Sequence, residues 1–170
     1  MRIEFSHLYN SLPVGWLDIE EALLLYEYAR RTEGDILEIG SFKGRSTTLL
    51  ASLGRTIHAV DPFDNFDEGV PGDDIEKVFK ENTSRFENVV LYRMRGEDWE
   101  PRPVGFAYLD GDHTYEGTVA QIKKALECNP QIIAVHDVND SGDGADIKRA
   151  CKELLGDYEI RAGKMAVWLR

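Results

Sequence analysis

The sequence has few cysteines and no long apolar run. Cys128 and Cys151 are its two cysteines in 170 residues. They lie far apart near the ends of helical patterns, so a disulfide framework or a zinc site is not expected, and both thiols are predicted to be buried in a reducing compartment. No stretch approaches the roughly 20 apolar residues that cross a bilayer, and the first residues lack a signal-peptide pattern. We therefore expect a soluble cytoplasmic protein.

Basic residues are also scarce relative to acidic ones. Lys and Arg total 20 against 31 Asp and Glu, which gives a net charge of −11. Such a field repels polyanions, so nucleic acids and acidic membrane surfaces are not expected as partners. No repeat is present, and the 42% hydrophobic content is enough for one globular core. We expect a small molecule as the main partner, and an N-terminal arm that packs on a twin subunit to form a homodimer remains open.

The middle of the chain alternates short apolar strands with amphipathic helices. Strands are predicted at 36–39, 56–60, 89–92, 104–109 and 132–135, and helices at 18–31, 45–53, 75–86, 115–126 and 145–155. Nearly continuous apolar strands between helices indicate an α/β fold with three layers, a mostly parallel sheet covered by helices on both faces. The last residues, 158–169, predict an antiparallel hairpin. We expect a single domain, 1–170, in which 1–35 form an N-terminal arm and helix and 36–170 form the core.

Acidic side chains follow almost every predicted strand. In an open parallel sheet, ligands bind outside the carboxyl ends of the strands. The residues at those ends include Glu38, Asp61, Glu97 with Asp98, Asp110 with Asp112 and His113, and His136 with Asp137. This many carboxylates at one edge would repel each other unless a ligand, a metal or hydrogen-bond donors compensate them. The site is therefore predicted at this edge.

Two glycines lie between the first strand and the next helix, in Glu38-Ile-Gly40-Ser-Phe-Lys-Gly44-Arg-Ser46. Gly40 allows a sharp turn and a close backbone approach to a ligand, and Gly44 allows the helix to begin close to the strand. The segment does not match the dinucleotide fingerprint, because two of its three glycine positions are occupied by other residues. It is not a P-loop either, since no Gly-Lys-Ser/Thr follows.

The Glu-x-Gly-x-x-x-Gly segment resembles the glycine motif of class I S-adenosylmethionine-dependent methyltransferases. The resemblance implies a Rossmann-like methyltransferase fold with a seven-stranded sheet, and it covers the chain from about residue 36 to its end. Asp61 is similar to the acid that holds the ribose diol, and Gly96-Glu97-Asp98 resembles the segment that borders the adenine. The implied cofactor-binding residues are Glu38, Gly40, Ser41, Gly44, Ser46, Asp61, Gly96, Glu97, Asp98 and Asp110.

The segment Asp110-Gly-Asp112-His113 is similar to a subgroup of small O-methyltransferases that modify antibiotic sugars or, more distantly, catechols. Members of this subgroup carry a divalent metal held by the fourth and fifth strand ends. The resemblance therefore implies Asp110, His136 and Asp137 as metal ligands. A histidine in this set favours zinc or a transition metal over magnesium. The alternative is that Asp110 contacts the cofactor while His136 makes structural hydrogen bonds.

His113 is the candidate general base that would take a proton from an acceptor hydroxyl, because an imidazole near its usual pKa suits that step. Asp112 would orient the ring or act as the base itself, and a helix-capping role for His113 is the alternative.

The sequence favours methyl transfer from S-adenosylmethionine to a small-molecule hydroxyl. Three alternatives stay open. They are an NAD-type oxidoreductase, a metal-dependent hydrolase or hydroxylase that uses Asp110, His136 and Asp137, and a non-catalytic cofactor-binding domain.

Overall fold

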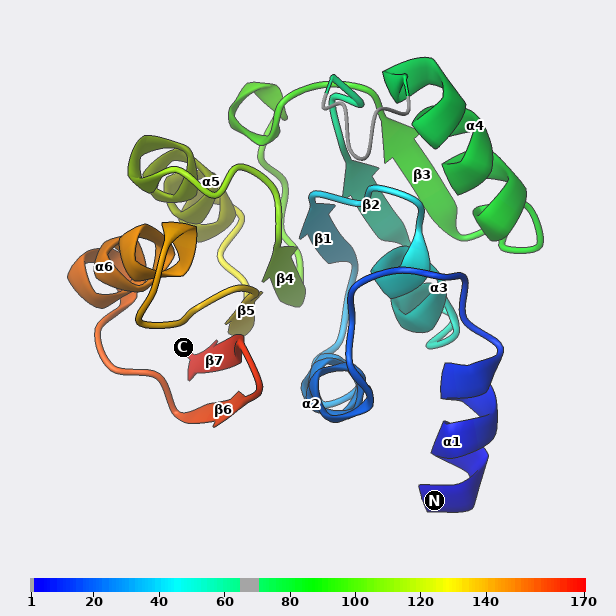
Figure 1. Ribbon diagram of the computed structural model, residues 1–170, viewed down its shortest axis with the longest axis horizontal. Helices are drawn as coiled ribbons and strands as arrows, with labels where there is room; N and C mark the ends of the chain where they lie inside the picture. Colours follow the sequence, from blue (N-terminus) through cyan, green and yellow to red (C-terminus); the bar gives the residue numbers. More distant parts are fainter. Residues whose placement is uncertain (1, 65–70) are drawn as a thin grey trace.

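The computed structural model describes residues 2–64 and 71–170. Seven strands form one sheet in the order β3-β2-β1-β4-β5-β7-β6 (Figure 1). The four pairings from β3 to β5 are parallel, and β7 runs antiparallel to both β5 and β6. The strands are β1 (Ile36–Ile39), β2 (Ile57–Val60), β3 (Val89–Tyr92), β4 (Phe106–Leu109), β5 (Ile132–Val135), β6 (Ile160–Ala162) and β7 (Met165–Leu169). The predicted fold class is confirmed.

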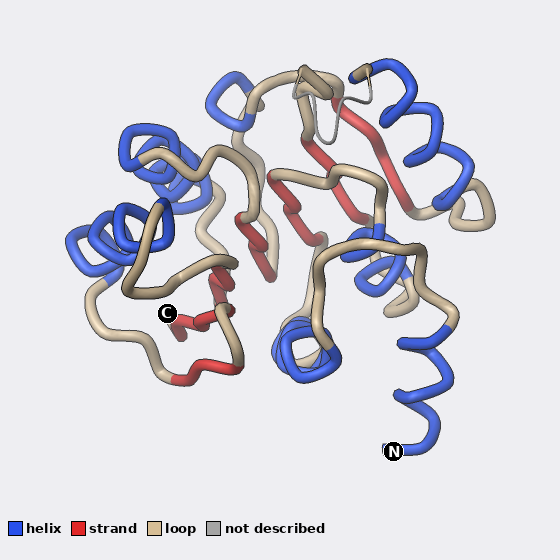
Figure 2. Tube along the Cα trace, viewed as in Figure 1, coloured by secondary structure: helices blue, strands red, loops and turns tan. Residues whose placement is uncertain are grey.

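Helices cover both faces of the sheet, and Figure 2 shows them on either side of the central strands. They are α1 (Arg2–Asn10), α2 (Ile19–Ala29), α3 (Arg45–Ala51), α4 (Gly72–Thr83), the short 3₁₀ helix η1 (Gly96–Asp98), α5 (Tyr115–Glu127) and α6 (Asp143–Leu155). The helices α1 to α4 lie on one side, and α5 and α6 pack together on the other (Figure 1).

Alternate residues of the same strands supply two separate cores. On β1, Ile36 faces the core under α1 to α4, whereas Leu37 and Ile39 face the core under α5 and α6. This division is the expected result of side chains pointing to opposite faces along a strand. Because both faces are covered, binding groups can reach solvent mainly at the ends of the strands.

The structure differs from the sequence prediction at element ends, at the N-terminus and at η1, a short helix that the sequence did not predict. The helix α4 begins at Gly72, three residues before the predicted start, and α1 forms where only an arm was expected. The acidic stretch 64–74, which contains two glycines and a proline, predicts an exposed loop. Its last three residues instead belong to α4, and 65–70 lie outside the described residues. Both cysteines are free and buried, as predicted. Among the described residues, no helix combines the length and apolar character needed to cross a membrane.

Candidate active site

A cavity of about 580 Å³ opens at the carboxyl ends of β1, β2, β4 and β5. Its wall contains residues from all the strand ends that the sequence singled out, together with part of the segment between α1 and α2. Among the predicted site residues, those lining it are Gly40, Ser41, Ser46, Asp61, Gly96, Glu97, Asp110, Asp112, His113, His136 and Asp137. Glu38, Gly44 and Asp98 are not part of its lining.

The glycine turn after β1 is fixed by a carboxylate from β2. Gly40 has φ of 88°, and a Cβ at this position would overlap the backbone of Asp110. Asp61 accepts hydrogen bonds from the N–H groups of Ser41 and Phe42 at 2.8 Å, and from Phe63 at 2.8 Å. Burial raises the pKa of Asp61 although these three donors act in the opposite direction. The turn, and the predicted ribose-binding acid, are therefore held as one unit.

Glu38 is a fully buried carboxylate beneath this turn. Its Oε2 accepts hydrogen bonds from the hydroxyls of Ser41 at 2.9 Å and Thr47 at 2.5 Å, but its Oε1 has no partner. Burial raises the pKa of Glu38 to about 7. An unpaired buried oxygen is costly in the free protein, and a donor that reaches it would recover that cost.

Two aspartates and two histidines meet between the ends of β4 and β5. Oδ1 of Asp110 lies 3.3 Å from Nδ1 of His136 and 3.7 Å from Nε2 of His113. Oδ2 of Asp137 lies 3.4 Å and 3.8 Å from the same two nitrogens. The hydroxyl of Tyr108 donates to the other oxygen of Asp110 at 3.0 Å. Each aspartate therefore faces both imidazole rings.

These contacts set the charges of the cluster. Burial alone would lower the pKa of His136, but the carboxylates around it raise the pKa well above its usual value. The pKa of Asp137 is held low by its contact with His136. Although burial opposes it, the positive charge of His136 also keeps the pKa of Asp110 low. The contact with Asp110 raises the pKa of His113. Both aspartates are thus ionised, with His136 as their internal counter-charge.

His136 is held from behind by a helix far away in the sequence. Its Nε2 lies 3.1 Å from Oε2 of Glu21 in α2. Glu21 is 4% exposed, and its Oε1 accepts a hydrogen bond from the N–H of Lys164 at 2.8 Å. The ammonium group of Lys164 is 3.2 Å from Oδ1 of Asp137. Glu21 stands three residues after Asp18, the spacing of a helix capping box, and the sequence predicts no site role for Glu21 or for Lys164.

The predicted catalytic residues His113 and Asp112 lie in different surroundings. His113 is partly buried and faces Asp110 and Asp137 across the cavity. Oδ1 of Asp112 instead accepts hydrogen bonds from the N–H and hydroxyl of Thr114, the residue that caps α5. Oδ1 of Asp112 is therefore engaged within the turn before α5, where it accepts from Thr114.

Of the three predicted metal ligands, His136 already has a partner at each of its two ring nitrogens. Nδ1 of His136 faces the two aspartates, and its Nε2 faces Glu21. Asp110, His113 and Asp137 each offer a ligand atom within 4.8 Å of the other two. The structure therefore brings the expected aspartates together with His113 as a third donor.

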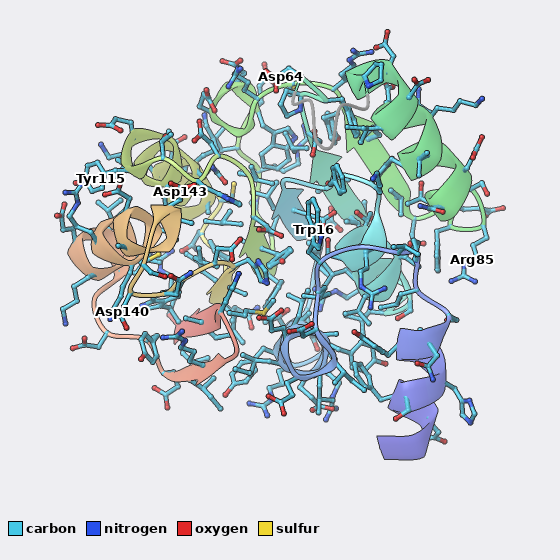
Figure 3. The ribbon with its side chains drawn as sticks, in the orientation of Figure 1. Trp16, Asp64, Arg85, Tyr115, Asp140 and Asp143 are labelled. Carbon is cyan, nitrogen blue, oxygen red and sulfur yellow. The ribbon has the colours of Figure 1, made fainter. Side chains whose placement is uncertain are left out.

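Part of the cavity rim comes from the segment between α1 and α2. The guanidinium of Arg45 donates to the carbonyl oxygens of Leu17 at 3.3 Å and Pro13 at 2.5 Å, which ties this segment to α3. Trp16, labelled in Figure 3, stacks on Phe42 with ring centroids 5.3 Å apart and remains 65% exposed. The rim thus presents a fixed aromatic surface to the cavity.

Comparison with known proteins identifies the family. Residues 37–138 match a family model described as a methyltransferase domain. The chain belongs to this methyltransferase family. The sequence-based assignment is confirmed, and neither an oxidoreductase nor a hydrolase gains support from the match. No curated protein matches the chain.

Solved structures of methyltransferases share the fold. CalS11, a TDP-rhamnose 3'-O-methyltransferase of calicheamicin biosynthesis, has a TM-score of 0.66 at 18% identity, covering 98% of this methyltransferase and 91% of its own chain. An O-methyltransferase from Bacillus cereus, in complex with SAH, has a TM-score of 0.66 at 16% identity, covering 99% and 90%. A candidate rRNA methylase from Clostridium thermocellum has a TM-score of 0.61 at 16% identity, covering 85% and 94%. At these identities the likeness establishes the fold alone.

Proposed function

We propose that this methyltransferase transfers a methyl group from S-adenosylmethionine to a hydroxyl group of a small molecule, with His113 as the general base. The observation that carries the proposal is the position of His113, which lines the same cavity as the Gly40 turn and Asp61 and faces two ionised aspartates. A proton acceptor and a nucleoside-binding turn therefore share one cavity, as the transfer requires.

The residues at the turn fit the methyl donor. S-adenosylmethionine, when bound, supplies an electrophilic methyl group on a positively charged sulfur. Glu38 does not itself line the cavity, but it lies behind the cavity-lining residue Ser41, and an ammonium group that reached its unpaired Oε1 would satisfy this acceptor. Asp61 already accepts three N–H groups, and the remaining lone pairs of its two oxygens can accept from a ribose diol. Glu97, exposed on the cavity wall, is the candidate for the adenine amino group.

His113 is placed to accept the acceptor's proton as the hydroxyl oxygen attacks the methyl carbon. Asp110 and Asp137 stabilise the imidazolium that results, because both carboxylates face its Nε2. The cost of a charged ring in a partly buried cavity is thereby reduced. Asp112 supports the turn that carries His113, and its carboxylate on the cavity wall is the alternative base.

A divalent ion is an alternative occupant of the acidic cluster. Asp110, His113 and Asp137 would hold it, and mixed oxygen and nitrogen donors suit zinc or another transition metal better than magnesium. When bound, such an ion would supply positive charge beside the acceptor oxygen. His113 would then be a ligand, and the role of base would pass to Asp112. The contacts of His136 with both aspartates favour the metal-free arrangement, because the aspartates already have a cation.

The acceptor class is tested by following a labelled methyl group. The protein is incubated with methyl-labelled S-adenosylmethionine and, separately, with the small-molecule, RNA and protein fractions of one cell extract. The proposal predicts label in the small-molecule fraction as an O-methyl group, lost in H113Q and retained in the presence of a chelator. Label in the RNA or protein fraction would contradict the acceptor class. Binding without any transfer would favour a non-catalytic cofactor-binding domain.

A further inference from the structure

Glu21 makes more contacts than a helix-capping residue needs. Capping of α2 uses one oxygen, because the N–H of Asp18 donates to Oε2 at 3.1 Å. The same oxygen also faces Nε2 of His136, and the second oxygen accepts the N–H of Lys164. One carboxylate therefore joins the beginning of α2, the end of β5 and the turn between β6 and β7.

The turn at Gly163 is built to admit this carboxylate. Gly163 has φ of 56°, and a Cβ there would overlap Oε1 of Glu21. The backbone of the turn can approach the carboxylate only because the residue is glycine. The next N–H, that of Lys164, then donates to Oε1, while the Lys164 ammonium reaches Asp137.

The two groups that Glu21 holds both contact the site. His136 lies 3.3 Å from Asp110 and 3.4 Å from Asp137, and Lys164 lies 3.2 Å from Asp137. These aspartates in turn are the carboxylates that face His113. A continuous chain of polar contacts thus runs from a helix outside the cofactor motifs to the candidate base.

We propose that Glu21 is a positioning residue of the methyl-transfer site, which fixes His136 and the Lys164 turn and through them the two aspartates that orient His113. This inference rests on the proposed function for its catalytic meaning, but the geometric link holds independently of it. Residues that orient metal-ligating side chains commonly change metal affinity or activity 10- to 100-fold when lost, and we expect an effect of the same order for a residue that orients a base.

The ring signals of the histidines report the positioning of His136 and His113 directly. The chain has four histidines, so each signal can be assigned by substitution. His7 is exposed on α1, and His58 contacts Asp35 and Tyr92 in another part of the fold. Both serve as internal references. Nitrogen-15 spectra of the histidine rings are compared for the wild type, E21Q and the matched control E20Q, which changes the exposed neighbour on the same helical turn.

The proposal predicts that E21Q shifts the ring signals of both His136 and His113, whereas His7 and His58 stay in place and E20Q leaves all four unchanged. A His113 signal that stays at its wild-type position in E21Q would overturn the proposal, whatever happens at His136. If E21Q fails to fold, E21D is used. It keeps the charge but is one methylene too short to hold both partners, and the same His113 criterion applies.

Activity and binding in the same samples separate this inference from the proposed function. We expect methyl transfer to fall about 10- to 100-fold in E21Q, while the Kd for S-adenosylmethionine stays within about twofold, because Glu38 and Asp61 are not among the contacts of Glu21. If the wild type neither binds S-adenosylmethionine nor transfers methyl, the proposed function fails, and the His113 signals still decide the positioning role.

Discussion

Glu21 and His136 lie 115 positions apart in the chain, and Oε2 of the one is 3.1 Å from Nε2 of the other. His136 is 6% exposed and its pKa is raised, so it carries a positive charge inside the fold. The carboxylate of Glu21 compensates that charge. It also ties the N-terminal helix α2 to the strand end that carries Asp137. The stability of the fold and the geometry of the site therefore depend on the same contact.

Removal of the Glu21 side chain is expected to destabilise the protein strongly. E21A leaves a buried imidazolium with one carboxylate fewer and leaves the N–H of Lys164 without its acceptor. Breaking a buried ion pair from one side typically costs about 3–5 kcal/mol. Urea unfolding of E21A and of the control E20A measures this difference, and equal stabilities for the two variants would refute it.

The pH dependence of methyl transfer should report His113. A general base works only when neutral, so the rate rises with pH through the pKa of His113. Because the contact with Asp110 raises this pKa, the midpoint is expected above the usual value of about 6.5. D137N removes a negative charge that favours the protonated ring, which lowers the pKa and moves the midpoint to lower pH. H113Q, which lacks the base, should show no such midpoint. A midpoint in D137N equal to that of the wild type would contradict the influence of Asp137 on the pKa of His113.

Glu38 is expected to cost stability at neutral pH. Its pKa is about 7 in the fold against 4.5 ordinarily, so the folded protein retains a proton that the unfolded chain releases. The contribution of Glu38 to stability is therefore full below pH 4.5, falls between pH 4.5 and 7, and is lower by roughly 3 kcal/mol above that window. E38Q abolishes this loss but replaces the charged acceptor offered to the methyl donor with a neutral amide. Urea unfolding at pH 4.5 and 8, with donor binding measured on the same variant, checks both effects.

Trp16 is expected to contribute to acceptor binding rather than to donor binding. Its ring is exposed on the cavity rim and stacked on Phe42, and an aromatic contact of this kind is worth about 1 kcal/mol. W16A should raise the KM for the acceptor about fivefold and leave the Kd for S-adenosylmethionine unchanged, whereas W16F should lie close to the wild type. Steady-state kinetics with the acceptor recovered from the small-molecule fraction gives both constants. An increase confined to the donor Kd would contradict this assignment.

Most of the fold was predictable because its signals are local. The apolar runs at 36–39, 89–92 and 132–135 form strands with the predicted bounds, and the residues after them line the cavity. Parallel strands bring their carboxyl ends to one edge, so residues distant in sequence could be assigned to one site. Asp110, His113 and Asp137 meet for this reason.

The rest of the site depends on contacts that local patterns do not contain. Glu21 was fully accounted for as a capping residue, so nothing in its sequence context indicated a second role. Lys164 reaches Asp137 because β7 inserts antiparallel beside β5, a pairing that the hairpin pattern alone does not specify. The role of His136 as a counter-charge, with both ring nitrogens engaged, likewise follows only from the packing of α2 against β5.

The central claim is that this methyltransferase binds S-adenosylmethionine in the cavity formed by Gly40 and Asp61. Isothermal titration of the wild type and of D61N with S-adenosylmethionine, each with and without a chelator, tests it most directly. We predict a single micromolar site in the wild type, insensitive to the chelator. D61N should bind about 10- to 100-fold more weakly, because a charged hydrogen-bond acceptor is lost. No binding to the wild type at millimolar concentration, or equal affinity of the two proteins, would contradict the account.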